Sequence, residues 1–158
     1  MSKITPFLWF DTEAEAAAEL YVSLFPNSRV TRCVRYGPGG RGPEGQVMTV
    51  EFELDGRPMV ALNGGPYFKF TEAVSFQVAC EDQAELDRLW DALLADGGKA
   101  SQCGWLKDRF GLSWQITPRI MGQLMSDPDP EASRRTTQAM LKMVKLDIAE
   151  LQRAHDGR

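Results

Sequence analysis

The stretch Val74–Cys80, which reads VSFQVAC, and the acidic helix start behind it decide the fold, because the chain contains this pattern twice. When the sequence is shifted by seventy positions, ITPFLWFDTEAEAAAELYVSLF from residue 4 lies on VSFQVACEDQAELDRLWDALLA from residue 74. Thr12 then falls on Asp82 and Glu15 on Glu85, so each copy has an oxygen-bearing N-cap with a glutamate three residues later. This repeat predicts two copies of one supersecondary unit.

Hydrophobic periodicity and turn residues give each copy the same order of elements, a strand, a helix and three further strands. In the first copy we expect a helix at 12–24 and strands at 4–10, 30–36, 46–54 and 58–63. In the second we expect a helix at 83–95 and strands at 74–80, 99–103, 105–109 and 112–117. The predicted class is therefore α+β, with paired βαβββ modules at about 1–70 and about 71–118. A C-terminal helical extension at about 119–158, with helices at 133–144 and 147–155, completes a single domain.

Composition excludes several classes of protein. The 158 residues are 43% hydrophobic, which is enough to bury a core, and the net charge of −4 argues against nucleic acid as a partner. No apolar run reaches the roughly eighteen residues that a membrane span needs. The N-terminus lacks the pattern of a signal peptide, so we expect a cytoplasmic protein without a membrane partner. Cys33, Cys80 and Cys103 are odd in number and widely spaced, which predicts reduced thiols.

Side chains along a strand alternate between the two faces of a sheet, so each strand can be divided by parity. In the second copy the apolar parity contains Val74, Phe76, Val78 and Cys80, and the mixed parity contains Ser75, Gln77 and Ala79. For the strand at 58–63, Val60 and Leu62 are assigned to the apolar face and Met59, Ala61 and Asn63 to the mixed face. The seventy-residue shift adds Thr5, Phe7 and Trp9 to the mixed face. Such a face can simply be solvated, but two large aromatic residues on it favour a ligand pocket.

This face and its rim supply the candidate site residues. The candidate ligand contacts are Phe7, Trp9, Asn63, Ser75, Gln77, Trp105 and Gln115. Glu51 is a candidate catalytic base or else a solvated strand residue, and Cys103 is a candidate reactive thiol or else a structural one. Because the single histidine, His155, lies in the last few residues of the sequence, an ordinary Ser-His or Cys-His catalytic pair is not expected.

Two loops have more than one interpretation. Residues 37–45 read GPGGRGPEG, which is typical of either a plain hairpin connection or a lid over a site. Lys107, Asp108 and Arg109 form either a surface turn with internal charge pairing or a gate over an anionic ligand. The turn that begins at Asn63 has a similar ambiguity, since its backbone N–H groups could hold an oxygen of a ligand.

Long local motifs resemble one known family. These are PFLWFD from residue 6, NGGPYFKFTEAVSF from 63, CGWLKDRFGLSWQI from 103 and MLKMVKLDIAEL from 140. They resemble the PhnB-like branch of the vicinal oxygen chelate superfamily, which includes glyoxalases, bleomycin resistance proteins and dioxygenases. Members of this branch are often labelled 3-demethylubiquinone-9 3-methyltransferase. The resemblance covers nearly the whole chain and implies the same paired βαβββ fold.

In the metal-using relatives four side chains, mostly His and Glu, hold a divalent ion. The resemblance places these ligands at about Thr5, Ala61, Ser75 and Gln115, where hydroxyl, methyl and amide groups replace the imidazole and carboxylate that such ions prefer. The single histidine, His155, lies in the last few residues, where we expect it to be solvated. We therefore expect no catalytic metal and no other cofactor.

The leading hypothesis is a PhnB-like protein that binds an unidentified small molecule between its sheets or at a subunit seam. A metal-dependent lyase, isomerase or dioxygenase is one alternative. A methyltransferase acting on a quinone-like phenol, as the family label says, is another, although the GPGG loop lies between two strands and lacks the strand-to-helix context of an adenosyl site. A homodimer is expected because modules of this fold commonly share their sheets.

Overall fold

The computed structural model describes residues 2–158, and the chain divides into two compact units. The first unit ends at Phe70 and the second is Thr71–Arg158. Each unit contains a strand, a helix and three more strands, and the second continues into three helices. This order confirms the α+β class with paired βαβββ modules and a C-terminal helical extension. No helix within residues 2–158 is long and apolar enough to cross a membrane.

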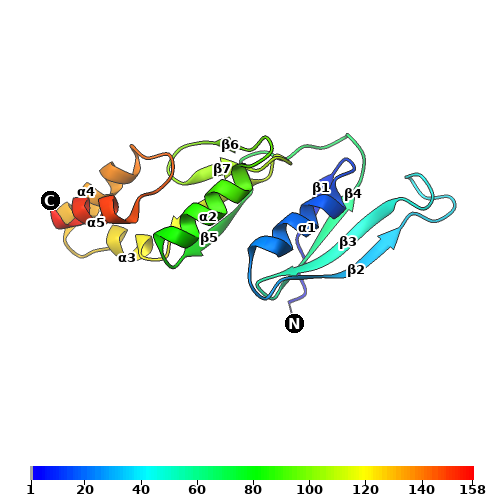
Figure 1. The fold of residues 1–158 in the computed structure, drawn as a ribbon, viewed down its shortest axis with the longest axis horizontal. Helices are drawn as coiled ribbons and strands as arrows, with labels where there is room; N and C mark the ends of the chain where they lie inside the picture. The colour runs from blue at the N-terminus through cyan, green and yellow to red at the C-terminus, as the bar shows by residue number, and fades with distance from the viewer. Residues whose placement is uncertain (1) are drawn as a thin grey trace. The chain divides into compact units, whose positions relative to one another are not determined.

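The first unit is a four-stranded sheet with one helix (Figure 1). Its elements are β1 (Phe7–Phe10), α1 (Ala14–Leu24), β2 (Arg29–Arg35), β3 (Val47–Leu54) and β4 (Arg57–Asn63). The strand order is β1-β4-β3-β2, in which β1 runs parallel to β4 and the other pairs are antiparallel. The connection through α1 allows this one parallel pair, because parallel neighbours need a crossover.

The core of the first unit lies between α1 and one face of this sheet. Four helix residues at helical spacing are fully buried: Ala14, Ala17, Ala18 and Tyr21. The small alanines let α1 approach β3 and β4, and the Tyr21 ring lies 6.5 Å from the ring of the buried Phe52. Burying a side chain of this size stabilises the fold by about 2 kcal/mol, so the helix stripe holds the unit together.

The second unit repeats the arrangement with shorter strands (Figure 1). Its elements are β5 (Ser75–Cys80), α2 (Gln83–Leu94), β6 (Lys99–Ala100), β7 (Trp105–Lys107) and β8 (Ser113–Pro118). The strand order β5-β8-β7-β6 corresponds to that of the first unit, and β5 runs parallel to β8. Trp114 and Ile116 of β8 and Leu86, Leu89 and Leu93 of α2 form the core.

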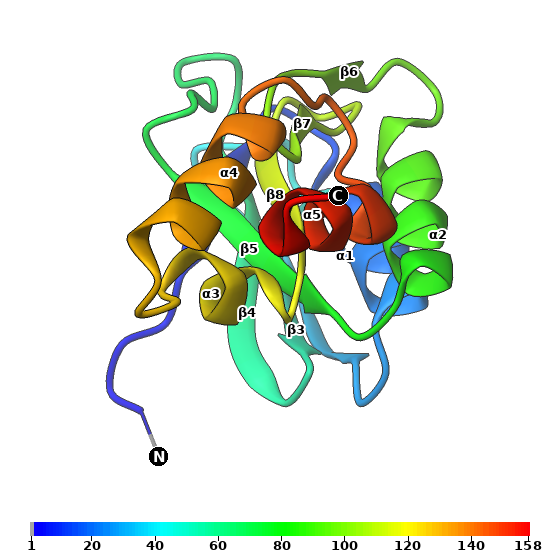
Figure 2. The same ribbon diagram turned by 90° about the vertical axis from the view of Figure 1, so that its left-hand side faces the viewer.

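The extension contains α3 (Met121–Met125), α4 (Pro130–Met140) and α5 (Ile148–Asp156), which Figure 2 shows beside each other in the second unit. The segment between α4 and α5 holds it to the rest of that unit. Gln83, at the start of α2, donates from Nε2 to Leu146 O at 3.1 Å and accepts from Ile148 N at 2.9 Å. Leu146 is fully buried, and Lys145 pairs with Asp87 at 2.8 Å. The extension therefore docks on α2 through the Gln83 amide and the Lys145–Asp87 ion pair, with Leu146 buried beside them.

The predicted start of the second helix is confirmed, whereas that of the first is wrong. Asp82 accepts from Glu85 N at 2.8 Å, as a local N-cap should. In the first unit the helix begins two residues after Thr12, and the N-cap residue Glu13 makes no side-chain capping bond. Asn63 of β4 takes over this role, because its Oδ1 accepts from Ala14 N at 2.8 Å.

The parity assigned to β4 is also wrong. Ala61 pairs with Leu8 and Val50, so it lies on the face that α1 covers and is fully buried. Val60 and Leu62 share the opposite face with Phe7 and Trp9. Both parities of this strand are apolar, so hydrophobicity carried no signal to tell them apart.

Candidate functional site

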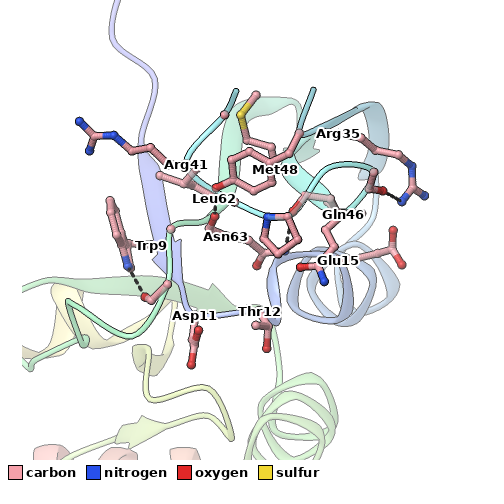
Figure 3. A pocket seen from close by; sticks show the side chains of 18 of the residues that line it. Trp9, Asp11, Thr12, Glu15, Arg35, Arg41, Gln46, Met48, Leu62 and Asn63 are labelled. Atoms are coloured by element: carbon pink, nitrogen blue, oxygen red, sulfur yellow. Dashed lines mark hydrogen bonds between the residues drawn. The ribbon is translucent and has the colours of Figure 1, made fainter. Parts of the chain in front are cut away.

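A pocket of about 1290 Å³ lies in the first unit (Figure 3). Four segments form it: the end of β1, the start of α1, the loop at residues 36–46 and the turn at residues 63–67. Both aromatic and charged side chains line it. The glycine-rich loop is therefore a wall of this pocket as well as a hairpin connection.

Trp9 forms one wall of the pocket, and its ring is held by the turn that follows β4. The indole Nε1 donates to Gly65 O at 3.0 Å (Figure 3). A Cβ atom at Gly64 would lie 2.2 Å from Cζ2 of the ring, so only glycine allows this approach. Phe68 meets the ring edge-on with a centroid distance of 4.9 Å. With its only polar atom bonded inside the protein, Trp9 offers a ligand an apolar surface.

Tyr36 holds the glycine-rich loop in place. Its hydroxyl donates to Asn63 O, and its ring occupies the place of a Cβ at Gly42, where the distance would be only 2.3 Å. Backbone bonds close the base of the loop, from Tyr36 N to Gln46 O and from Gly45 N to Tyr36 O, both at 2.8 Å. The loop is thus tied both to itself and to the end of β4.

Asn63 lines the pocket, but its polar atoms are bonded to the protein. Oδ1 caps α1 at Ala14 N, and Nδ2 donates to Val47 O at 3.0 Å. Its carbonyl accepts from Tyr36. The structure thus places this predicted ligand contact at a junction of α1, β3 and the loop. Sequence reasoning did not identify Tyr36, and the only signal for it was its position just before the glycine-rich segment.

Charged side chains of both signs line the pocket. Figure 3 shows Arg41 on the same side as Trp9, and Arg35, Gln46 and Glu15 on the other. Arg35 donates to Gly45 O at 3.0 Å. Within residues 2–158 Arg41 makes no ion pair or side-chain hydrogen bond. The pocket therefore contains cationic groups that no carboxylate of the described chain neutralises.

Four predicted contacts lie in the second unit and share one face of its sheet. Ser75 and Gln77 of β5 pair with Ser113 and Gln115 of β8, and Gln115 pairs with Trp105 of β7. Gln115 Nε2 donates to Ser75 Oγ at 2.9 Å. Ser113 is only 1% exposed, and its Oγ is the one buried side-chain polar atom without a partner among residues 2–158. The parity argument was correct for this unit, which presents neutral hydrogen-bonding groups.

The remaining candidates lie apart from the pocket. Phe7 is 62% exposed and does not line the pocket. Glu51 shares the face of Trp9 and lies 3.8 Å from Arg32. Cys103 is half-buried with a positive φ of 57°, and its N–H donates to Met143 O. The cysteines are free thiols, and burial raises the pKa of Cys80 to about 12.

The turn at Lys107–Arg109 is built around a buried carboxylate. Asp108 is 3% exposed and accepts from Phe110 N, Leu112 N and Trp114 Nε1, at 2.9, 3.1 and 2.9 Å. Lys107 pairs with Glu72, and Arg109 lies 3.6 Å from Asp96. Because a buried carboxylate needs such partners, Asp108 organises the hairpin from inside.

His155 is also not the solvated tail residue that was expected. Its side chain is 18% exposed, and its Nε2 lies 3.1 Å from Asp127 Oδ2, which links α5 to the loop before α4.

Among residues 2–158 no group of three His, Cys, Asp or Glu side chains could hold a metal ion. Of the four positions that the family resemblance gives, Thr5 precedes β1 and Ala61 is buried under α1, while Ser75 and Gln115 bond to each other. These donors do not fit a transition metal.

The paired βαβββ modules and the matches of the chain to known proteins define a PhnB-like protein of the glyoxalase superfamily. A solved structure described as a putative 3-demethylubiquinone-9 3-methyltransferase, PhnB protein, from Bacillus cereus is 36% identical, with a TM-score of 0.68 over 74% of this chain and 99% of that chain. Residues 2–117 match the family model for 3-demethylubiquinone-9 3-methyltransferase. The chain therefore belongs to that family.

Two further structures are more distant. A Pseudomonas aeruginosa protein is 20% identical, with a TM-score of 0.61 over 75% of this chain and 98% of that chain, and it shows the fold alone. A glyoxylase/bleomycin resistance protein/dioxygenase domain from Frankia is 14% identical, with a TM-score of 0.41 over 72% and 89% of the two chains. No curated protein matches the chain. The family match ends before α3, so the helical extension lies outside it.

Proposed function

We propose that the chain is a small-molecule-binding protein that holds its ligand in the pocket of the first unit without a catalytic metal. The observation that carries this proposal is the way Trp9 is held, with its nitrogen bonded to Gly65 O and its ring against Gly64. A preformed aromatic wall is typical of ligand sites, which are mostly apolar and have few polar groups. The pocket volume of about 1290 Å³ is large enough for an organic molecule of several rings.

Titration with the neutral dye Nile red, followed by its fluorescence, tests this proposal. We expect saturable binding to the native protein, and a loss of at least about tenfold in affinity for Gly64→Ala, because the new methyl group displaces the Trp9 ring. Gly122→Ala is the matched control, since a Cβ there meets nothing within 4 Å. Equal affinity in both variants would place binding outside this pocket.

Trp9→Leu and Trp105→Leu distinguish the two units. Trp9 lines the pocket and Trp105 belongs to the second sheet. A loss of binding in Trp9→Leu alone is the expected result. A loss in Trp105→Leu alone would instead place binding at the neutral hydrogen-bonding face of the second unit.

The family description favours a second candidate, methyl transfer to a quinone-like phenol. That reaction needs a site for S-adenosylmethionine, so calorimetric titration with this cofactor decides between the two. Absence of saturable binding is expected under our proposal, and stoichiometric micromolar binding would replace it. Metal analysis of the purified protein tests the third hypothesis, a metal-dependent lyase, isomerase or dioxygenase. A stoichiometric divalent ion would support it.

The homodimer is also a proposal. Large apolar side chains are exposed in each unit, with Phe68 at 66% and Tyr67 at 77% in the first and Val74 at 65% in the second. Contact with a second copy would remove such side chains from water. Light scattering at micromolar concentration measures the mass directly, and a monomer would contradict the proposal.

We also propose a cytoplasmic location. The three free thiols fit a reducing compartment, which supports this proposal.

A further inference from the structure

We propose that the pocket of the first unit takes a planar aromatic acid that also carries a hydroxyl or amino donor. This inference rests on the proposed function and specifies its ligand class. The aromatic rings lie against Trp9, the acidic group faces Arg41, and the donor faces Glu15.

The two aromatic walls, Trp9 and Tyr36, select a flat, apolar body because their polar side-chain atoms are already bonded. Trp9 Nε1, the Tyr36 hydroxyl and both amide atoms of Asn63 all have partners within the unit. The glycines at 64 and 42 hold the two rings against the backbone, so the rings are ordered before a ligand arrives. Preordered aromatic surfaces favour flat molecules, since stacking costs little conformational entropy.

The arginines of this unit differ in what they bind. Arg29 pairs with Glu53 at 3.1 Å and Arg32 lies 3.8 Å from Glu51, and neither lines the pocket. Arg41 lines the pocket and has no carboxylate partner within residues 2–158. A guanidinium is always charged and matches the geometry of a carboxylate. Arg35 also lines the pocket without an ion pair, but it donates to Gly45 O at 3.0 Å, so Arg41 is the pocket arginine that has no protein partner among residues 2–158.

Carboxylates on the pocket wall set the orientation of that ligand. Glu15, in the first turn of α1, and Asp11 line the pocket and form no ion pair with the described chain. Figure 3 shows Glu15 on the side away from Arg41. An ionised carboxylate repels a second one and accepts hydrogen bonds, so Glu15 disfavours the acidic group on its own side, where Arg35 is bonded to Gly45 O, and a donor fits there.

Calorimetric titrations with three naphthalene probes test the inference at about 0.15 M salt. 6-Hydroxy-2-naphthoate has both groups, 2-naphthoate lacks the donor, and 2-naphthol lacks the acid and is neutral near pH 7. We expect the affinity to fall in that order. Arg41→Gln weakens the two acids by about threefold to fivefold, the range for an exposed ion pair, and leaves 2-naphthol unchanged. Glu15→Ala weakens the two probes that carry a hydroxyl donor, 6-hydroxy-2-naphthoate and 2-naphthol, and does not weaken 2-naphthoate.

Arg32→Gln is the matched control, because Arg32 is on the neighbouring strand and does not line the pocket. Its affinities for all three probes should equal those of the native protein. If 2-naphthol binds as tightly as the acids, or if Arg41→Gln changes nothing, the ligand class is wrong while binding in the pocket stands. If none of the probes binds although Nile red does, the ligand class is again wrong. Failure of the dye as well would overturn both proposals.

Discussion

The two units share one topology but differ in their connections. In the first unit the residues between β2 and β3 form a glycine-rich wall, and a pocket lies against it. In the second unit residues 101–104 alone join β6 to β7, and a buried carboxylate organises the next turn. The sheets are equivalent in strand order, whereas the loops are not. The duplicated scaffold is thus kept, whereas the pocket lies at the loops of the first copy.

The sharpest test of the second unit is Asp108→Ala. The change leaves Phe110 N, Leu112 N and Trp114 Nε1 without the acceptor that they share, so the free energy of unfolding should fall by about 3 kcal/mol. Urea denaturation measures the change. Asp96→Asn is the control, because Asn also tolerates the positive φ of 59° at this position and the change removes only the charge that lies 3.6 Å from Arg109, which should cost less than about 0.5 kcal/mol. Similar losses in both variants would show that the turn does not depend on its buried acid.

Substitutions at the helix N-caps compare how much capping stabilises each unit. Asn63→Ala removes the cap of α1 and the bond to Val47 O, and should destabilise the protein by about 2 kcal/mol. Asp82→Ala removes one local cap from α2 and should cost about 1 kcal/mol. The same urea experiment reports both. A larger loss for Asp82→Ala would mean that the remote cap matters less than the local one.

The cysteines of the two units should respond differently to pH and to thiol reagents. Cys80 is fully buried with a folded pKa of about 12, against 9.0 for an ordinary thiol. Because the unfolded thiol ionises first, stability should fall as pH rises above 9 and lose about 1 kcal/mol by about pH 10. Denaturation of Cys80→Ala should lack this part of the pH profile. In the native protein a thiol reagent should label the exposed Cys33 first, and early labelling of Cys80 would contradict its burial.

The smallest effect is expected at Ser113. Its buried hydroxyl has no partner among the described residues, so Ser113→Ala should leave stability unchanged or raise it by about 0.5 kcal/mol. Thermal denaturation with and without ligand measures this. Ser75→Ala is the comparison, because it removes the acceptor of Gln115 Nε2 and should be destabilising. Destabilisation by Ser113→Ala would indicate that a bound molecule satisfies the hydroxyl.

The sequence was sufficient for features that repeat or lie close together along the chain. The shift between Thr12 and Asp82 predicted both modules, and alternation correctly placed Ser75, Gln77 and Gln115 on one face. It failed at β4, where Ala61 and Leu62 are both apolar and the register alone decides which is covered. It also failed for contacts between distant residues, since nothing local in the sequence connects Asn63 with Ala14 or with Tyr36.

Asn63 gives the pocket a built-in spectroscopic reporter. Its side-chain oxygen accepts a hydrogen bond from Ala14 N, and its backbone carbonyl accepts one from the Tyr36 hydroxyl. One residue therefore connects the first turn of α1 with the glycine-rich loop. A bound ligand that shifts the loop changes the electronic environment of the Ala14 amide proton without contacting it. The position of the Ala14 amide resonance in a nitrogen–proton correlation spectrum therefore reports how much of the pocket is occupied, and the ligand itself needs no label.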